Sequence, residues 1–139
     1  MNDKSSDKME NGKPKFDWVT QRSACSLPKV FAALRQQVEG DVKTRNGLRP
    51  NYAPYEFSMT EDTAVFTVHL KAKEMERSVT FSLEEHAIQV RDNDKNGAMF
   101  QLTATFNEQG ECALFANEEE REFWQIRRMA LEDLMFRQE

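Results

Sequence analysis

Residues 64–83 read AVFTVHLKAKEMERSVTFSL, and this stretch decides the fold that the sequence predicts. A period of two between apolar residues is typical of a strand that buries one face. The polar gap around Lys73 and Glu74 is short, which favours antiparallel pairing of the two halves. Apolar side chains occupy alternate positions in both halves: Ala64, Phe66, Val68 and Leu70, then Val79, Phe81 and Leu83.

The same alternation continues on both sides of this stretch, and turn residues fill the gaps between the runs. Six short strands result, and the simplest arrangement for them is a six-stranded antiparallel meander. Polar residues such as Thr67, His69 and Thr80 alternate with the apolar ones, so one sheet face is apolar and the other is polar and exposed to solvent. The further apolar runs are Tyr55, Phe57 and Met59; Ile88 and Val90; Phe100, Leu102, Ala104 and Phe106; Cys112 and Leu114.

A helix is expected before these strands and another after them. Ser26 is a plausible N-cap for the first helix, Pro28 suits its first turn, and Asn46-Gly47 suits its end. The last helix is expected to begin at Asn117, with Glu120 completing an approximate capping box. Their apolar stripes are Leu27, Val30, Phe31, Leu34, Val38 and Val42 in the first helix, and Phe123, Trp124, Ile126, Ala130, Leu131, Leu134 and Met135 in the last.

These elements predict an α+β fold: an N-terminal helix, a six-stranded antiparallel meander sheet and a C-terminal helix, with both helices packed on the apolar sheet face. A strongly curved sheet around the last helix, or a partly closed barrel, fits equally well. The polar residues 1–15 show no period, so we expect a disordered tail there. Residues 16–139 are predicted to form a single domain.

Charge and composition limit the partners and the location. Residues 1–50 carry a net charge of +4 and residues 51–139 a net charge of −9. An acidic body repels phosphate, so no nucleic-acid partner is expected. No apolar run is long enough to span a membrane, and residues 1–15 lack the apolar segment of a secretory signal. We therefore expect a cytoplasmic protein in which Cys25 and Cys112 are reduced thiols; a disulfide between them stays an alternative.

The sharpest motif is DNDKNG at residues 92–97. Asp92, Asp94 and Asn96 match the first three ligand positions of a calcium loop, and Gly97 matches its turn glycine. Thr103 stands where the loop needs a bidentate glutamate, and the flanks alternate like strands. We interpret the motif as a hairpin turn in which Asn96-Gly97 has positive φ angles. A weak cation site at the hairpin tip is the alternative.

Three residues are candidates for binding a ligand. Arg127 falls in the middle of the apolar face of the last helix, where a charge must pair with a carboxylate, reach water or meet a partner. Trp124 widens the same face. His69 lies on the polar, solvent-exposed face of the predicted sheet. The preferred interpretation is that Arg127 extends past the helix to water or pairs with a carboxylate, and an anion contact in a pocket between helix and sheet is the alternative.

The chain has no recognisable metal-ligand set, nucleophile set or phosphate-binding loop, and no cofactor is expected. We predict a non-catalytic protein-interaction or adaptor module, acting with a protein partner or as a homodimer. Met129 and Phe136 fall outside the main stripe of the last helix, which suggests surface left for a partner. One alternative is a domain with a pocket between curved sheet and C-terminal helix that binds a small anionic or apolar molecule. Another is an enzyme that uses His69 with a neighbouring carboxylate.

Overall fold

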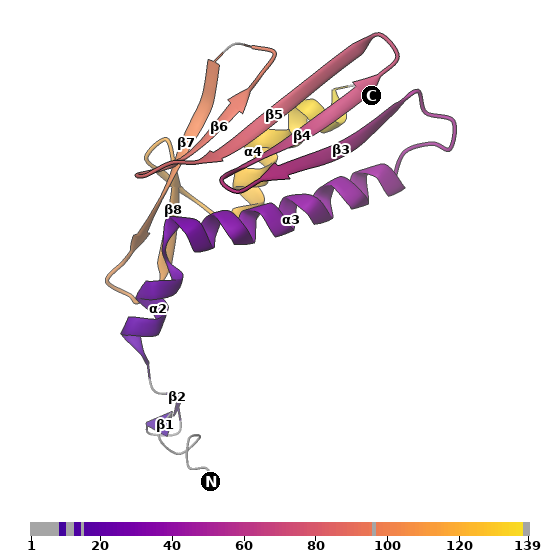
Figure 1. Ribbon diagram of the computed structural model, residues 1–139. Coiled ribbons are helices and arrows are strands. Elements are labelled where there is room, and N and C mark those ends of the chain that lie inside the picture. Colours follow the sequence, from indigo (N-terminus) through magenta and orange to yellow (C-terminus); the bar gives the residue numbers. More distant parts are fainter. Residues whose placement is uncertain (1–8, 11–12, 15, 96, 138–139) are drawn as a thin grey trace.

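The computed structural model describes residues 9–10, 13–14, 16–95 and 97–137. The predicted α+β fold is confirmed, because a long helix, an antiparallel meander sheet and a C-terminal helix follow one another, with both of these helices on one sheet face (Figure 1). The helices are α2 (Trp18–Ala24), α3 (Leu27–Gly47) and α4 (Phe123–Phe136). The strands are β1 (Met9–Glu10), β2 (Lys13–Pro14), β3 (Tyr55–Asp62), β4 (Val65–Ala72), β5 (Met75–Leu83), β6 (Ile88–Asp92), β7 (Gly97–Phe106), β8 (Cys112–Ala116) and β9 (Glu119–Arg121).

The main sheet is a meander of seven strands, one more than predicted. Each strand from β3 to β9 pairs antiparallel with the next one along the chain. The extra strand, β9, forms where the sequence suggested the start of the last helix. Asn117 and Glu118 have φ angles of 52° and 74°, and a two-residue turn with both φ angles positive joins strands that twist together. Left-handed residues cannot begin a right-handed helix, so the predicted start at Asn117 is wrong.

Helix α4 instead begins at Phe123 with Glu122 as its N-cap. A capping box holds this end: the Glu122 side chain accepts from the backbone of Gln125, and the Gln125 side-chain oxygen accepts from the Glu122 backbone N–H at 2.9 Å. Two of the N–H groups that a helix start leaves unpaired are thereby satisfied. The capping chemistry expected from Asn117 and Glu120 is therefore present, but five residues later.

The sequence signals for α3 are confirmed at both ends. The Ser26 hydroxyl accepts from the backbone N–H of Lys29 at 3.4 Å, Pro28 lies in the first turn, and the helix ends at Gly47. A short helix that the sequence pattern did not indicate, α2, precedes it. Its N-cap is Asp17, whose carboxylate accepts from the backbone N–H of Thr20 at 3.3 Å. No residue of α2 is buried, and it projects from the body (Figure 1).

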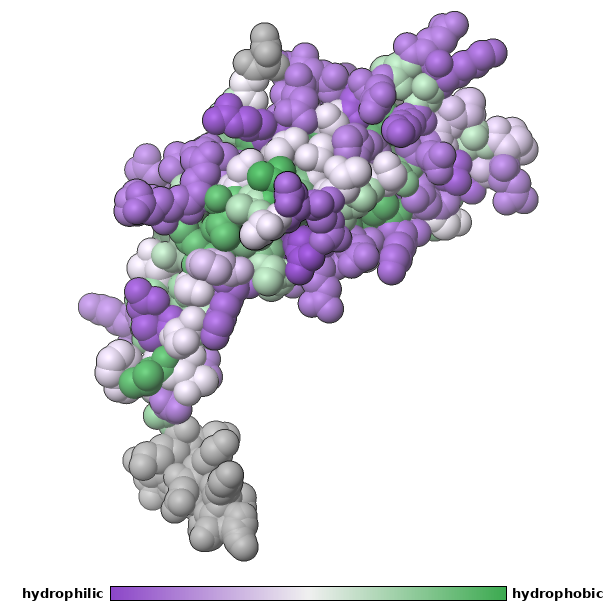
Figure 2. Space-filling view, viewed as in Figure 1, coloured by the Kyte–Doolittle hydropathy of each residue, from purple (hydrophilic) through white to green (hydrophobic). Residues whose placement is uncertain are grey.

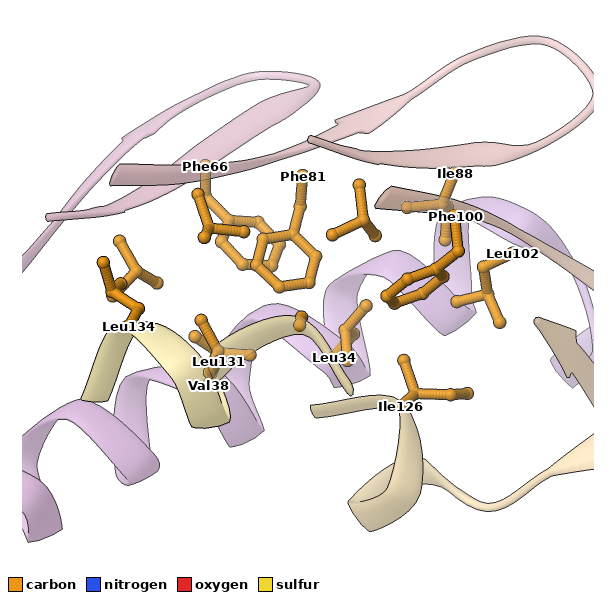
Figure 3. Close-up of a cluster of buried hydrophobic side chains, with 14 of the residues drawn as sticks. Leu34, Val38, Phe66, Phe81, Ile88, Phe100, Leu102, Ile126, Leu131 and Leu134 are labelled. Atoms are coloured by element: carbon orange, nitrogen blue, oxygen red, sulfur yellow. The ribbon is translucent and has the colours of Figure 1, made fainter. Parts of the chain in front are cut away.

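The core lies between the concave side of the sheet and the two longer helices. Side chains from both layers point toward one another there and fill the space (Figure 3). Phe66 and Phe81 stack with ring centroids 4.5 Å apart, and Phe31 of α3 lies 5.2 Å from Phe66. The largest buried residues are Phe57, Phe66, Phe81, Leu34, Leu70, Ile88, Leu102, Ile126 and Leu134. The apolar sheet face and both helical stripes are largely the ones that the sequence indicates, but Trp124, which was expected to widen the buried face of the last helix, is 52% exposed.

The end of α3 is fixed to the edge strand β3. Asn46 acts as a strand partner: its amide nitrogen donates to the Phe57 carbonyl at 2.8 Å, and its oxygen accepts from the Phe57 N–H at 2.9 Å. Arg49 donates to the carbonyl of Tyr55. These contacts occupy part of an otherwise open sheet edge, which would pair readily with another chain.

The N-terminal tail falls largely outside the described residues. Residues 9–10 and 13–14 pair as two short antiparallel strands. The predicted disorder of residues 1–15 stays a prediction. Among the described helices, none combines the length and the apolar character that crossing a membrane requires.

Cys25 follows α2, and Cys112 begins β8. They form a disulfide with Cα atoms 5.3 Å apart, so the expectation of two reduced thiols is wrong. The two residues are separated by 87 positions, and only the folded chain brings them together. The disulfide ties the junction of α2 and α3 to the far end of the sheet.

Candidate functional site

A groove lies between the C-terminal half of α3 and helix α4. Its volume is about 320 Å³. The sheet-facing residues of α4 are Ile126, Ala130 and Leu134, and they are buried, whereas most residues lining the groove are exposed. The groove therefore opens away from the sheet. We call it the helix groove; its lining includes Asp41, Arg45, Leu48, Trp124, Arg127 and Phe136.

The rim of the helix groove is apolar and exposed to solvent. Leu48 is 68% exposed, Trp124 52% and Phe136 46%. Met129, 38% exposed, lies beside Trp124 in a smaller adjoining hollow. Single exposed apolar residues are common on proteins, but a group around a concavity is typical of a binding surface.

Trp124 also borders a wider and shallower hollow that leads toward the disulfide. This hollow has a volume of about 670 Å³ and lies between the start of α3, strand β8 and the start of α4. Its lining includes Ala33, Gln37, Cys112 and Leu114. Trp124 and Arg127 line both hollows, so they lie where the two meet. Figure 2 shows further hydrophobic residues at the surface of the body and on α2.

Arg45 lies in the floor of the helix groove with only 3% of its surface exposed. Its Nε donates to the carbonyl of Met135 at 2.8 Å, in the last turn of α4. The guanidinium carbon lies 4.8 Å from the ring centre of Phe136, 5.2 Å from that of Phe57 and 5.7 Å from that of Tyr55. A cation near the C-terminus of a helix stabilises its exposed carbonyl groups. Arg45 thus joins the ends of α3 and α4 and supports Phe136.

We expect Arg45→Met to lower the free energy of unfolding by about 2 kcal/mol. A hydrogen bond to a charged group contributes about 1.5–3 kcal/mol, and cation–π contacts with three rings add to it. Methionine keeps most of the apolar volume of the arginine side chain, so the loss of stability is due to the missing guanidinium group. Urea denaturation measures it. Leu48→Ser, a change at an exposed position of the same groove, is the control and should stay within about 0.5 kcal/mol. An equal loss in both variants would contradict this role.

Arg127 crosses the helix groove from α4 to α3. Its Nε donates to the Asp41 carboxylate at 2.7 Å, and a terminal nitrogen donates to the Gln37 side-chain oxygen at 2.5 Å. The sequence interpretation in which Arg127 pairs with a carboxylate matches this geometry. The positive charge of Arg127 is therefore paired with a carboxylate within the fold. Arg128 points outward and pairs with Glu132 one turn later at 3.0 Å.

His69 lies on the other face of the sheet, away from Arg127 and Trp124. Its Nε2 is 2.9 Å from the Thr60 hydroxyl, and its Nδ1 is 3.9 Å from a Glu76 carboxylate oxygen. The neighbouring Thr67 and Thr80 hydroxyls bond to each other across β4 and β5 at 3.0 Å. The structure thus brings two of the three candidate ligand-binding residues together and leaves His69 in a separate polar network.

The DNDKNG segment is a hairpin turn between β6 and β7, as the sequence suggests. Gly97 begins β7 without a positive φ angle, so that part of the turn prediction is wrong. Asn96 lies outside the described residues. Asp92 is 3% exposed, and its carboxylate accepts from the backbone N–H of Asp94 at 3.0 Å. The Asp92 carboxylate therefore stabilises the turn, and the Asp94 carboxylate accepts from the backbone N–H of Ser78 in β5 at 3.1 Å.

A guanidinium lies among the acidic groups of this hairpin. Arg77 of β5 approaches Asp92 at 3.5 Å and Asp94 at 3.7 Å, and it donates to Asp133 of α4 at 2.9 Å. Lys95 and Arg137 also contact Asp133. We call Arg77, Asp92, Asp94 and Asp133 the hairpin cluster. Within the described residues, no group of histidine, cysteine, aspartate and glutamate is arranged to hold a metal ion.

Electrostatics within the hairpin cluster favour the charged forms. The hydrogen bond from Arg77 lowers the pKa of Asp133 below its ordinary value of 3.8, and burial opposes this only in part. The same hydrogen bond raises the pKa of Arg77. The cluster connects the hairpin β6–β7, strand β5 and helix α4 through one partly buried cation, Arg77.

The space between sheet and α4, where the sequence suggested a ligand pocket, is filled by core side chains (Figure 3). The concavity lies on the other side of α4. Sequence reasoning missed Arg45 and Arg77, although a signal existed for both. Arg45 continues the apolar stripe of Val38 and Val42, and Arg77 holds an inward position in line with Val79. A charge at a buried position of a periodic pattern indicates a paired cation.

Comparisons of the chain with protein-family models, with curated proteins and with solved structures gave no match.

Proposed function

We propose that this protein is a non-catalytic protein-binding module and that the helix groove is its binding surface. The observation that carries the proposal is a row of three exposed apolar side chains, Trp124, Leu48 and Phe136, along the rim of a concavity. Tryptophan and other aromatic residues near the centre of a surface supply most of the energy in protein interfaces. Burying half-exposed apolar side chains stabilises a complex by about 25 cal/mol for each Å² removed from water.

The groove suits a protein segment better than a small anionic ligand. Its volume of about 320 Å³ is at the lower limit of pockets that enclose ligands, and its rim is open. Arg127 is paired with Asp41, and Arg128 with Glu132, so neither has an unused charge for an anion. An apolar side chain packed on Trp124 or on Phe136 would instead displace water without breaking an ion pair. The small-ligand alternative is therefore restricted to an apolar molecule.

The described titratable groups support a binding role over catalysis. Both cysteines are joined in the disulfide, which leaves neither as a thiolate nucleophile. His86 is almost fully exposed beside Glu85, and His69 bonds to Thr60 on the sheet face opposite the groove. A catalytic histidine needs a convergent pocket with a reacting atom in reach.

The cytoplasmic location remains a prediction, and the disulfide opposes it, because the cytosol keeps thiols reduced. A protein isolated without reductant from its natural source would carry two reactive thiols if it came from the cytosol. The same protein from an oxidising compartment would carry none. Titration of thiols in that material therefore tests the location directly.

The test of the proposed function is a comparison of immobilised variants. Wild-type protein, Trp124→Ser/Phe136→Ser and the control Val65→Ser/Met75→Ser are incubated with extract of the source organism, and retained proteins are identified by mass spectrometry. Val65 and Met75 are exposed apolar residues outside the groove. We expect at least one protein to be retained by wild type and control and, once purified, to bind the groove variant at least about 30-fold more weakly.

Two results would contradict this function. Identical sets of retained proteins for all three baits would show that the groove binds none of them. A rise in melting temperature with an uncharged apolar ligand such as decanol, abolished by Trp124→Ser, would favour the small-ligand alternative because a ligand of the folded state stabilises it by mass action.

A further inference from the structure

We propose that the disulfide between Cys25 and Cys112 is a reversible redox latch for helix α2. In the oxidised protein the disulfide holds α2 on the end of the sheet, and reduction by a dithiol releases residues 16–24 while the packed body stays folded. The inference does not depend on the helix groove or on its occupant. It rests on where the two cysteines lie and on how weakly other contacts hold α2.

The two cysteines differ in their access to solvent. Cys112 begins strand β8 and is exposed, whereas Cys25 is 4% exposed. In thiol–disulfide exchange a thiolate approaches one sulfur along the line of the S–S bond, so access decides which sulfur is attacked. A reductant therefore attacks Cys112, and Cys25 is the leaving group. Exposed disulfides are the ones that exchange readily and serve in regulation.

The reaction balances with a dithiol as the only co-reactant. A thiolate of the dithiol attacks Sγ of Cys112, the bond between the two cysteines breaks, and Cys25 leaves as a thiolate that takes up a proton. The second thiolate of the dithiol then attacks the dithiol sulfur of this mixed disulfide and releases the Cys112 thiolate, which is protonated in turn. The protein gains two electrons and two protons, and the dithiol becomes a disulfide. Oxidised glutathione, a disulfide oxidant, reverses the change.

Apart from the disulfide, only weak contacts hold the described part of α2 on the body. None of its seven residues is buried, and a helix this short is unstable in water without tertiary contacts. Phe16, which precedes α2, stacks on Phe106 with ring centroids 6.5 Å apart and packs over Gly110, but it is itself 56% exposed. One half-exposed ring removes too little area from water to offset the entropy of ordering nine residues.

The release has a structural boundary at Ser26. The Ser26 hydroxyl caps α3 through the backbone N–H of Lys29, and Pro28 suits the first turn, so α3 begins independently of α2. Among the described residues, the buried cluster between helices and sheet begins at Val30 in α3 and at Leu114 in β8, and it includes neither cysteine. Loss of the disulfide therefore frees the segment before Ser26 and leaves this packing in place.

Release of α2 also changes the surface beside Trp124. Ala24, the last residue of α2, and Cys112 both line the wider hollow that Trp124 borders. When α2 leaves, this hollow loses the part of its wall that Ala24 forms. The redox state of the two cysteines thus sets the shape of a surface that adjoins the helix groove.

The first measurement is reduction of the full chain by dithiothreitol near neutral pH without denaturant. Thiols are trapped with N-ethylmaleimide and counted by mass spectrometry, and proton NMR follows the methyl resonances of the core. We expect both thiols to appear, the core resonances to persist, and oxidised glutathione to restore the disulfide. With reduced glutathione in place of the dithiol, the mixed disulfide should be found on Cys112. Reduction that occurs only in urea that unfolds the chain would overturn the proposal.

The second measurement is cleavage of the folded protein by trypsin after Arg22, an exposed residue of α2. A protease requires a locally unfolded segment, so the rate of this cleavage measures the release of α2. We expect Cys25→Ala/Cys112→Ala to be cleaved after Arg22 at least about 10-fold faster than oxidised wild type. Reduced wild type with blocked thiols should behave like the variant. Arg128 of α4, which is also exposed, is the control site and should stay uncut in all three.

A Phe16→Ala variant separates the disulfide from the ring contact. With the disulfide intact, this variant should resist cleavage after Arg22 nearly as well as wild type. If oxidised Phe16→Ala is cleaved as fast as the double cysteine variant, the ring and not the disulfide holds α2, and the proposal fails. Equal cleavage of oxidised wild type and the double cysteine variant would also overturn it. Neither result bears on the helix groove, which is tested separately by the proteins that its variants retain.

Discussion

Replacing Arg77 by alanine is expected to lower the free energy of unfolding by about 3 kcal/mol. Removal of one partner from a buried ion pair costs about 3–5 kcal/mol because the other charge stays buried without compensation. Here the Asp92 side chain is 4% exposed and Asp133 is 26% exposed, so the lower end of that range applies. Urea denaturation at pH 7 measures the loss.

The same variant should change the response to acid. The pKa of Asp133 is lowered in the folded protein, so its contribution to stability is complete above its ordinary value of 3.8. Below that value the unfolded chain binds more protons, and the contribution is lost as the pH falls through the folded pKa. Because Arg77 is the main cause of the lowered value, the stability difference between pH 7 and pH 3 should be smaller in Arg77→Ala than in wild type.

A surface ion pair provides the control for this prediction. Arg128 and Glu132 are both more than half exposed, and such a pair contributes about 0.3–0.5 kcal/mol. Arg128→Ala should therefore leave both the stability at pH 7 and its acid dependence nearly unchanged. If Arg77→Ala behaves like Arg128→Ala, the hairpin cluster does not connect α4 to the sheet energetically.

The parts of the fold that depend on local periodicity were predictable from the sequence. Alternation in residues 64–83 indicates two antiparallel strands, and Ser26 with Pro28 indicates the start of α3. The start of α4 was not predictable by the same means. Asn117 suits both an N-cap and a left-handed turn residue, and only the pairing of β9 with β8 decides between them.

The candidate site depended on contacts between distant residues. Trp124 and Arg127 were identifiable because they interrupt or widen the stripe of one helix. The groove itself was not, because it requires Asp41 and Leu48 of α3 to lie beside them, about 80 residues earlier in the chain. The side of α4 on which a concavity opens is decided by how completely the core fills the other side. No local sequence pattern indicates how completely the core side chains fill the space between α4 and the sheet.

The second large effect is expected from the disulfide. Cys25→Ala/Cys112→Ala should lower the free energy of unfolding by about 3–4 kcal/mol, because the bond closes a loop across a sequence separation of 87 residues and restricts the unfolded chain. Urea denaturation of the variant and of oxidised wild type measures the difference. Reductant should destabilise wild type by a similar amount and leave the double variant unchanged. An effect of reductant on the double variant would contradict this interpretation.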